Sequence, residues 1–227
     1  MNTALSAPLG SRILDTFRAP RRLAARLEPY WPFAGALGLV IGIGMLVLTQ
    51  VPDSFFVAMS ENPVDRLGRP VELTSDAATI GRWGRFMAMF TVLVQRPLLA
   101  CGIAGVLVLV FSLREKGGSA GFRSYFALTA HALLIPALGE LIGLVLGLAR
   151  GGGVMPISLA LLAPGLDPGS FLYALLEGIN PFTIWMLVML AIAASALKQR
   201  EESWKPVSLL LVGAYGALAT LVAAVTT

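Results

Sequence analysis

The feature that most constrains this chain is the stretch from Gly178 to Leu197, which contains no charged residue. As a helix, about twenty residues cover roughly 30 Å, the thickness of the hydrocarbon core of a bilayer. The stretch includes Asn180-Pro181-Phe182-Thr183-Ile184-Trp185. Pro181 suits a first helical turn, where its missing N–H leaves no helical hydrogen bond unmade. We therefore interpret this segment as one membrane span among several.

Composition also favours a membrane protein. Hydrophobic residues make up 56% of the 227 residues and charged residues only 13%, whereas a typical soluble domain carries about 25% charged residues. The apolar content would leave too little polar surface to cover a soluble domain. The single cysteine, Cys101, excludes an internal disulfide framework and is interpreted as a small apolar residue in a span. We predict an all-α integral membrane fold.

The sequence predicts a bundle of five transmembrane helices over residues 30–227. An apolar tract from Phe86 to Leu113 is interrupted by Arg96-Pro97, so the second span is placed after the interruption. The predicted spans are 33–50, 95–113, 125–148, 180–197 and 207–225. Residues 84–95 are expected to form an interfacial or half-buried helix that leads into the second span, and a continuation of the second span is left open as the alternative. Six spans are the alternative, if 76–95 adds a re-entrant or tilted segment.

The distribution of basic residues predicts the orientation. They gather before the first span, after the second and after the fourth: Arg12, Arg18, Arg21, Arg22, Arg26, Arg114, Lys116, Arg123, Lys198, Arg200 and Lys205. In a five-span protein these three segments share one side, and the side richer in Lys and Arg is the cytoplasmic one. We expect the N-terminus in the cytoplasm and the C-terminus outside. The late first apolar window argues against a cleaved signal peptide.

Residues 1–29 are predicted to form a basic, amphipathic cytoplasmic segment. Pro20 can begin a second short helix that carries Leu23 and Leu27. The candidate contacts to a lipid surface are Arg18, Arg21, Arg22 and Arg26. Basic side chains on such a helix are attracted to anionic lipid headgroups. The alternative is a basic flank that only sets the topology.

Residue patterns for catalysis are missing. The run Gly151-Gly152-Gly153 has neither a strand before it nor a lysine after it, so it does not indicate a phosphate-binding loop. The only histidine, His131, has no neighbouring histidine or cysteine with which to hold a metal, and no nucleophilic triad pattern is present. We expect a protein that is not an enzyme, needs no cofactor and binds no nucleic acid.

Glu140 and His131 form the candidate intramembrane polar site. A carboxylate near the middle of the third span costs on the order of 3 kcal/mol, and such residues usually face the bundle interior or a cavity. The carboxyl could be protonated, or paired with His131, Arg96 or Arg150. Nine positions place His131 and Glu140 on opposite helix faces unless Pro136 kinks the helix. The functional hypothesis is an ion or proton relay, or a contact to a partner's span. The alternative is a polar residue that ties helices together.

Small residues predict close helix packing. Gly139, Gly143 and Gly147 lie four residues apart on one face of the third span, and Gly213 and Gly216 lie in the fifth. Such ladders let helix backbones approach each other. We expect the ladder of the third span to pack inside the bundle. A homo-oligomer remains an alternative.

Three motifs, in their order and spacing, resemble bacterial members of the Yip family, the Ypt-interacting-protein type of membrane domain. The motifs are Phe17–Arg22 followed by Pro32, Gly121–Phe126 followed by Pro136, and Asn180–Trp185. The candidate family residues are Asn180, Pro181, Phe182, Thr183 and Trp185. The resemblance implies about five spans and a cytoplasmic N-terminus. Two features depart from the family: Ala193 stands where bacterial relatives commonly have glycine, and the Asp-Leu-Tyr-Gly-Pro motif of eukaryotic relatives is absent, so their small-GTPase partnership does not carry over.

The resemblance implies a non-enzymatic membrane protein of the bacterial inner membrane, acting as an accessory or adaptor subunit in export or envelope maintenance. Its partners would be the lipid bilayer and other membrane proteins, among them an ABC-type exporter. Two alternatives are a small transporter or channel with Glu140 in its path, and a structural subunit of a larger complex. A transporter should place more polar residues beside Glu140. At a similar depth the sequence offers only a few polar residues, with Thr129, His131 and Thr183 as the nearest candidates. This scarcity favours the adaptor.

Overall fold

The computed structural model describes residues 7–27, 32–58, 76–114, 121–150, 153–197 and 204–226. These residues form helices and connecting loops without a strand. In chain order the helices are α1 (Leu9–Arg18), α2 (Pro20–Leu27), α3 (Ala34–Thr49), α4 (Asp53–Ala58), α5 (Ala77–Arg114), α6 (Phe122–Ala132), α7 (Leu134–Ala149), the 3-10 turn η1 (Leu159–Leu162), α8 (Phe171–Gly178), α9 (Pro181–Leu197) and α10 (Trp204–Thr226). The predicted all-helical class is confirmed.

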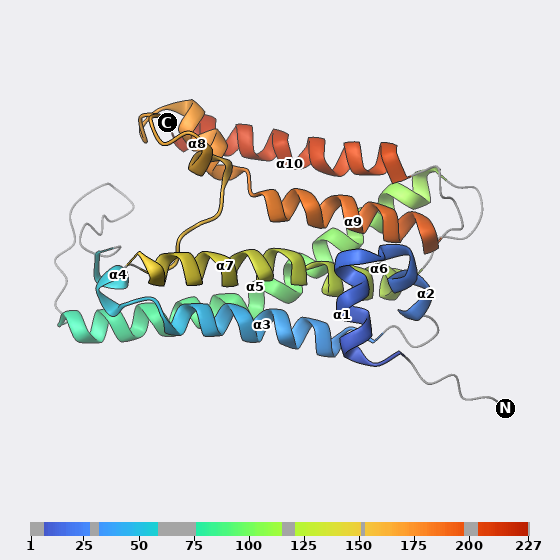
Figure 1. Cartoon of the computed structure of the whole chain (residues 1–227), viewed down its shortest axis with the longest axis horizontal. Helices are drawn as coiled ribbons and strands as arrows, with labels where there is room; N and C mark the ends of the chain where they lie inside the picture. Colours follow the sequence, from blue (N-terminus) through green and yellow to red (C-terminus); the bar gives the residue numbers. More distant parts are fainter. Residues whose placement is uncertain are drawn as a thin grey trace.

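The long helices lie side by side. Figure 1 shows α3, α7, α9 and α10 roughly parallel, with α5 crossing behind them and with α1 and α2 in front near one end. Packing joins α3 to α7, α7 to α9 and α9 to α10, while α5 packs on α3 and α6. The far end of α10 and the α1–α2 pair lie at opposite ends of the bundle.

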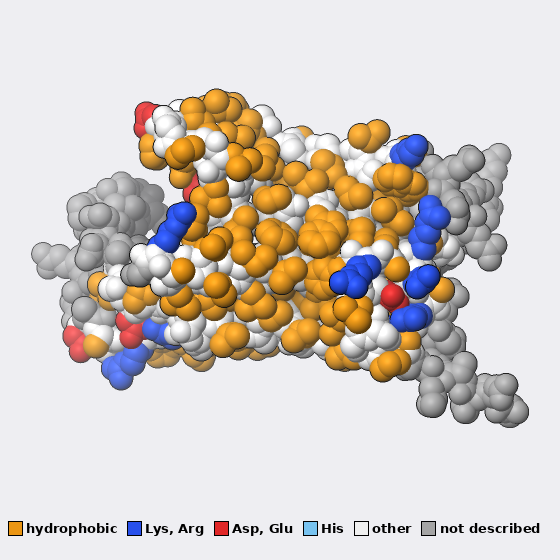
Figure 2. Space-filling view, viewed as in Figure 1, with side chains coloured by type: hydrophobic (Ala, Val, Ile, Leu, Met, Phe, Trp, Pro, Cys, Tyr) orange, Lys and Arg blue, Asp and Glu red, His pale blue; other side chains and the backbone are white. Residues whose placement is uncertain are grey.

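Three helices are long and apolar enough to cross a membrane: Ala78–Ser112, Phe122–Ala149 and Trp204–Thr226. A fourth crossing results if α8 and α9, which are bent by 46° at their break, count as one span. Helix α3 is apolar but has only 16 residues. The side chains on the visible face fit a membrane protein. Hydrophobic residues cover the middle of the molecule, and charged residues gather towards its two ends (Figure 2). The chain is thus a membrane protein by helix length and composition.

The second predicted span differs from the structure. Of the two placements left open for residues 84–95, the structure has the continuous one, because α5 is one helix of 38 residues that continues through Arg96-Pro97. Pro97 removes one helical hydrogen bond, yet a helix that ended inside a bilayer would leave several backbone groups unsatisfied in hydrocarbon. Continuing the helix is therefore the less costly arrangement. At about 57 Å, α5 exceeds the thickness of a hydrocarbon core.

Pro136 interrupts the third predicted span only locally. Helix α6 ends at Ala132 and α7 begins at Leu134, and Leu133 N donates to Thr129 O at 2.9 Å across the junction. Proline at position 136 has no N–H to donate to Ala132, which explains the irregular turn at this point. Together α6 and α7 still form one 28-residue apolar segment.

The core surrounds α6, where eight of the eleven residues are buried. Helix α2 covers this core by packing on α9 and α6, with Leu23 and Leu27 buried. Aromatic pairs connect the motifs that carry the Yip resemblance: the ring centroids of Phe17 and Trp185 lie 5.7 Å apart, and those of Phe126 and of Phe33, the residue after Pro32, lie 4.9 Å apart. The three motifs therefore belong to one packed unit.

The glycine ladder of α7 packs inside the bundle, as predicted. A Cβ atom at Gly139 would lie 2.7 Å from the Phe182 ring on α9. At Gly143 and Gly147 it would overlap the carbonyl groups of Met155 and Gly153, because the chain returns along α7 there. Met155 N donates to Gly143 O at 3.0 Å. These glycines let a loop, as well as a helix, approach α7.

Arg85 closes the C-terminal end of α3. Its Nη1 donates to Thr49 O at 2.9 Å and to Leu48 O at 3.3 Å, and its Nη2 lies 2.6 Å from an oxygen of Asp53. The last carbonyl groups of a helix have no partner within the helix. A cation at that end also interacts favourably with the negative end of the helix dipole. One arginine of α5 thus fixes both α3 and the short α4.

Replacing Arg85 by alanine should lower the free energy of unfolding by about 1 kcal/mol, because the α3 carbonyl groups lose their donor while the pair with Asp53 is partly exposed. The matched control is Arg82→Ala, since Arg82 is exposed and donates only a 3.4 Å hydrogen bond to Thr79. Denaturant titration in detergent micelles measures both variants. Equal effects of the two substitutions would contradict the capping role.

Candidate functional site

The site is a cavity of about 1040 Å³ between α5, α7, α9 and α10. Helix α5 packs on α3, α4 and α6, and α10 packs on α8 and α9. Among the described helices, α5 and α10 do not pack extensively on each other, and the cavity lies between them. Residues on this open side line the cavity and are exposed, among them Leu98 (63%) and Leu218 (58%). The cavity volume lies at the upper end of the range typical of small-molecule sites.

Glu140 lines this cavity together with Arg96, and the two side chains form an ion pair in which Arg96 Nη2 donates to Glu140 Oε1. The side chain of Arg96 is 16% exposed and that of Glu140 is 29% exposed. Of the partners that the sequence left open for Glu140, Arg96 is the one found. A desolvated ion pair of this kind is costly to break from one side, because the remaining charge is left without compensation.

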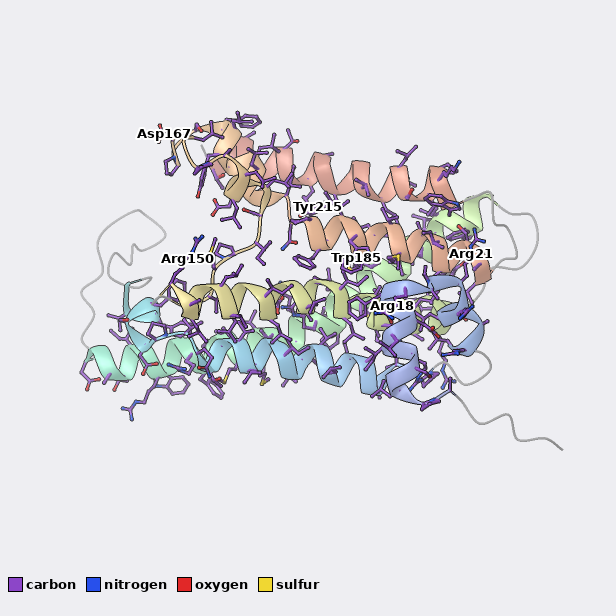
Figure 3. All side chains as sticks on the ribbon, in the orientation of Figure 1. Arg18, Arg21, Arg150, Asp167, Trp185 and Tyr215 are labelled. Carbon is purple, nitrogen blue, oxygen red and sulfur yellow. The ribbon has the colours of Figure 1, made fainter. Side chains whose placement is uncertain are left out.

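Asn180 caps α9 and connects the cavity wall. Its Oδ1 accepts the Phe182 N–H at 2.8 Å, the usual arrangement for an N-cap residue followed by proline. Tyr215 of α10 also bonds to the backbone at the start of α9. Its hydroxyl accepts the Asn180 N–H at 2.9 Å and donates to Gly178 O at 2.8 Å. Figure 3 shows Tyr215 next to the break between α8 and α9. These bonds satisfy backbone groups where the span is bent.

The other members of the predicted motif have separate roles. Thr183 lines the cavity and lies about one helical turn after Asn180 along α9. Phe182 covers Gly139 of α7, and Trp185 contacts the rings of Phe17 and Phe182. The motif therefore bends the span, packs α9 on its neighbours and supplies two polar residues to the cavity.

His131 lies away from Glu140, in the buried core at the end of α6. Its Nδ1 lies 2.9 Å from Ala127 O, so Nδ1 carries the proton that is donated there. The Nε2 atom is buried and has no hydrogen-bond partner among the described residues. The cavity lining does not include His131, so the two predicted members of the polar site are not brought together.

The four predicted lipid-contact arginines are exposed on α1 and α2. Arg26 lies 2.7 Å from Asp15, which joins α2 to α1. Figure 3 labels Arg18 and Arg21 on this helix pair, and Figure 2 shows basic side chains gathered at the same end of the molecule. We call Arg18, Arg21, Arg22 and Arg26 the basic face. On the opposite side of α1, burial lowers the pKa of Arg12 below its ordinary value.

Sequence reasoning named Arg96 as a possible partner of Glu140 but missed Gln95 and Tyr215, which also line the cavity. Gln95 adjoins Arg96 in the sequence, whereas Tyr215 lies in the last predicted span, far from both. For Gln95 the available signal was its place beside a charge within an apolar tract, because such charges usually face a cavity or an intramembrane partner. Thr129, expected near Glu140 by depth, instead donates to Tyr125 O within α6.

Among the described residues no group of three or more His, Cys, Asp or Glu side chains could hold a metal ion. Cys101 is exposed on α5. Comparison with known proteins adds no relative: no protein family, curated protein or solved structure matches this chain.

Proposed function

We propose that the protein is an accessory or adaptor subunit of a bacterial inner-membrane assembly, built as five spans with its N-terminus in the cytoplasm. The observation that carries this proposal is the basic face. Helices α1 and α2 are packed on α6 and α9 through buried side chains, yet they present four arginines to the surroundings. A charged face held in place by buried contacts suits recognition of an acidic partner, because complementary charges steer and orient association.

The arrangement of the ends supports the same proposal. An odd number of crossings places the two chain ends on opposite sides, and the far end of α10 lies at the opposite end of the bundle from α1 and α2. Helix α3 would supply the fifth crossing. Its 16 residues cover about 24 Å, so the bilayer would have to be locally thinner for α3 to cross it.

The test is co-purification of the tagged protein at its native level in mild detergent, followed by mass spectrometry. We expect a membrane protein in fixed proportion to the chain. Reversing two charges of the basic face, Arg18→Glu with Arg22→Glu, should reduce its recovery at least fivefold. The matched control is Arg82→Glu, an exposed arginine on α5 near α4, the other end of the bundle. Purification of the chain alone, or equal recovery with both charge reversals, would contradict the proposal.

A second candidate function is a small transporter or channel. It is favoured by the number of polar side chains around Glu140, since Thr91, Gln95, Arg96, Asn180, Thr183 and Tyr215 line the same cavity. Reconstituted protein that dissipates a proton or ion gradient, with the flux lost in Glu140→Gln, would favour this alternative over the adaptor.

A further inference from the structure

Polarity in the cavity is sorted along the bundle axis. The apolar Phe90, Val94 and Leu218 lie in the half nearer α8, and among them lie the polar lining residues: Thr91, Gln95, Arg96, Glu140, Asn180, Thr183 and Tyr215. The half nearer α1 and α2 is lined by Ile103, Val106, Leu133, Leu187 and Leu211. A largely apolar cavity whose polar groups gather in one half, open on its side between α5 and α10, has the shape and chemistry of a site for an amphiphile.

The direction of this gradient agrees with the direction of a membrane lipid. Counted along α6 and α7, Glu140 lies about 27 Å from the start at Phe122 and about 13 Å from the end at Ala149. The polar end is therefore displaced from the middle of the bundle towards the α8 end. A lipid from that leaflet would place its headgroup at the polar end and its chain at the apolar end without turning over.

The charges in the cavity select among headgroups. Arg96 and Glu140 neutralise each other, so a headgroup with a net negative or net positive charge would bring an uncompensated charge into the cavity. A zwitterion satisfies both, because its anion can accept from the guanidinium while its cation donates to the carboxylate.

We propose that this cavity binds one zwitterionic phospholipid, with the phosphate at Arg96, the ammonium group at Glu140 and an acyl chain along the apolar half of the wall. The Tyr215 hydroxyl and the Thr183 side chain border the headgroup position. The proposal does not depend on the adaptor function, because it follows from the cavity alone and not from the basic face.

The experiment is a titration of delipidated protein with phosphatidylethanolamine and with phosphatidylglycerol, followed by native mass spectrometry. We expect one retained copy of phosphatidylethanolamine and at least fivefold weaker retention of phosphatidylglycerol. Water-soluble phosphoethanolamine, which lacks the chain, should not compete at the same concentration. Tighter retention of phosphatidylglycerol, or competition by phosphoethanolamine, would overturn the proposed headgroup or chain contacts.

Two variants on one helix locate the bound lipid. Ala214 of α10 lines the cavity, whereas Ala217 of the same helix is exposed and lies outside the lining. Ala214→Trp should weaken phosphatidylethanolamine retention at least tenfold, and Ala217→Trp should leave it unchanged. Equal retention by the two variants would show lipid bound to the general helix surface and would overturn the proposal.

A third variant tests the role of charge. Glu140→Gln leaves the cavity with the charge of Arg96 alone, so the preference should reverse in favour of phosphatidylglycerol. An unchanged preference in this variant, with circular dichroism equal to the original, would contradict the assignment of the ammonium group to Glu140.

Discussion

Replacing Arg96 by leucine is expected to lower the free energy of unfolding by about 3 kcal/mol, because Glu140 then remains in a largely apolar cavity without its partner. Glu140→Gln should cost less, about 1 kcal/mol, since the amide oxygen still accepts from Arg96. The sequence likewise predicts that Glu140→Gln keeps the fold and impairs function. Titration with SDS in mixed micelles measures each variant.

The control is the double variant Arg96→Leu with Glu140→Leu, in which neither charge is left alone. Replacing a buried ion pair by apolar residues is often neutral or stabilising, so this protein should recover most of the stability that Arg96→Leu loses. Glu140→Leu alone completes the comparison: if the losses of Arg96→Leu and Glu140→Leu simply add in the double variant, the ion pair does not contribute to the fold as described.

Gly147→Val is the second substitution with a large expected effect. A Cβ atom at Gly147 overlaps the carbonyl of Gly153, so the returning chain must move away from α7. That movement also strains the hydrogen bond between Met155 N and Gly143 O. Overpacking of this kind costs about 1–3 kcal/mol, and we expect a value near the upper limit because the obstacle is backbone.

A glycine on an open face provides the matched control. A Cβ atom at Gly213 of α10 meets nothing within 4 Å. Gly213→Ala should therefore leave the unfolding free energy within about 0.5 kcal/mol or raise it slightly, since alanine is the better helix former. A loss in Gly213→Ala as large as that in Gly147→Val would show that both glycines serve helix flexibility and not close packing.

Hydropathy and proline positions were enough to predict the helical class and several boundaries. Pro20 and Pro181 both begin helices in the structure, α2 and α9. The apolar windows at 33–50, 180–197 and 207–225 correspond to α3, α9 and α10. These elements are predictable because helix starts and apolar length are local properties of the sequence.

The errors arose where tertiary contacts override a local signal. Arg96-Pro97 reads locally as a break, but continuity within the membrane and the pairing of Arg96 with Glu140 keep α5 whole. The cavity depends on four helices that are distant in sequence, so spacing alone could not bring Tyr215 to Asn180. His131 and Glu140 share one apolar segment, yet the structure separates a core histidine from a cavity carboxylate.

The membrane sidedness of the bundle's two ends tests the five-span arrangement directly. Single cysteines in a Cys101→Ser background would be placed at exposed Ala25 on α2, and at Asp167 and Thr226 near the other end. Each would be treated with a membrane-impermeant maleimide in spheroplasts. With five crossings, Asp167→Cys and Thr226→Cys are labelled in intact spheroplasts, and Ala25→Cys only after permeabilisation. Labelling of Ala25→Cys and Thr226→Cys from the same side would contradict the odd number of crossings.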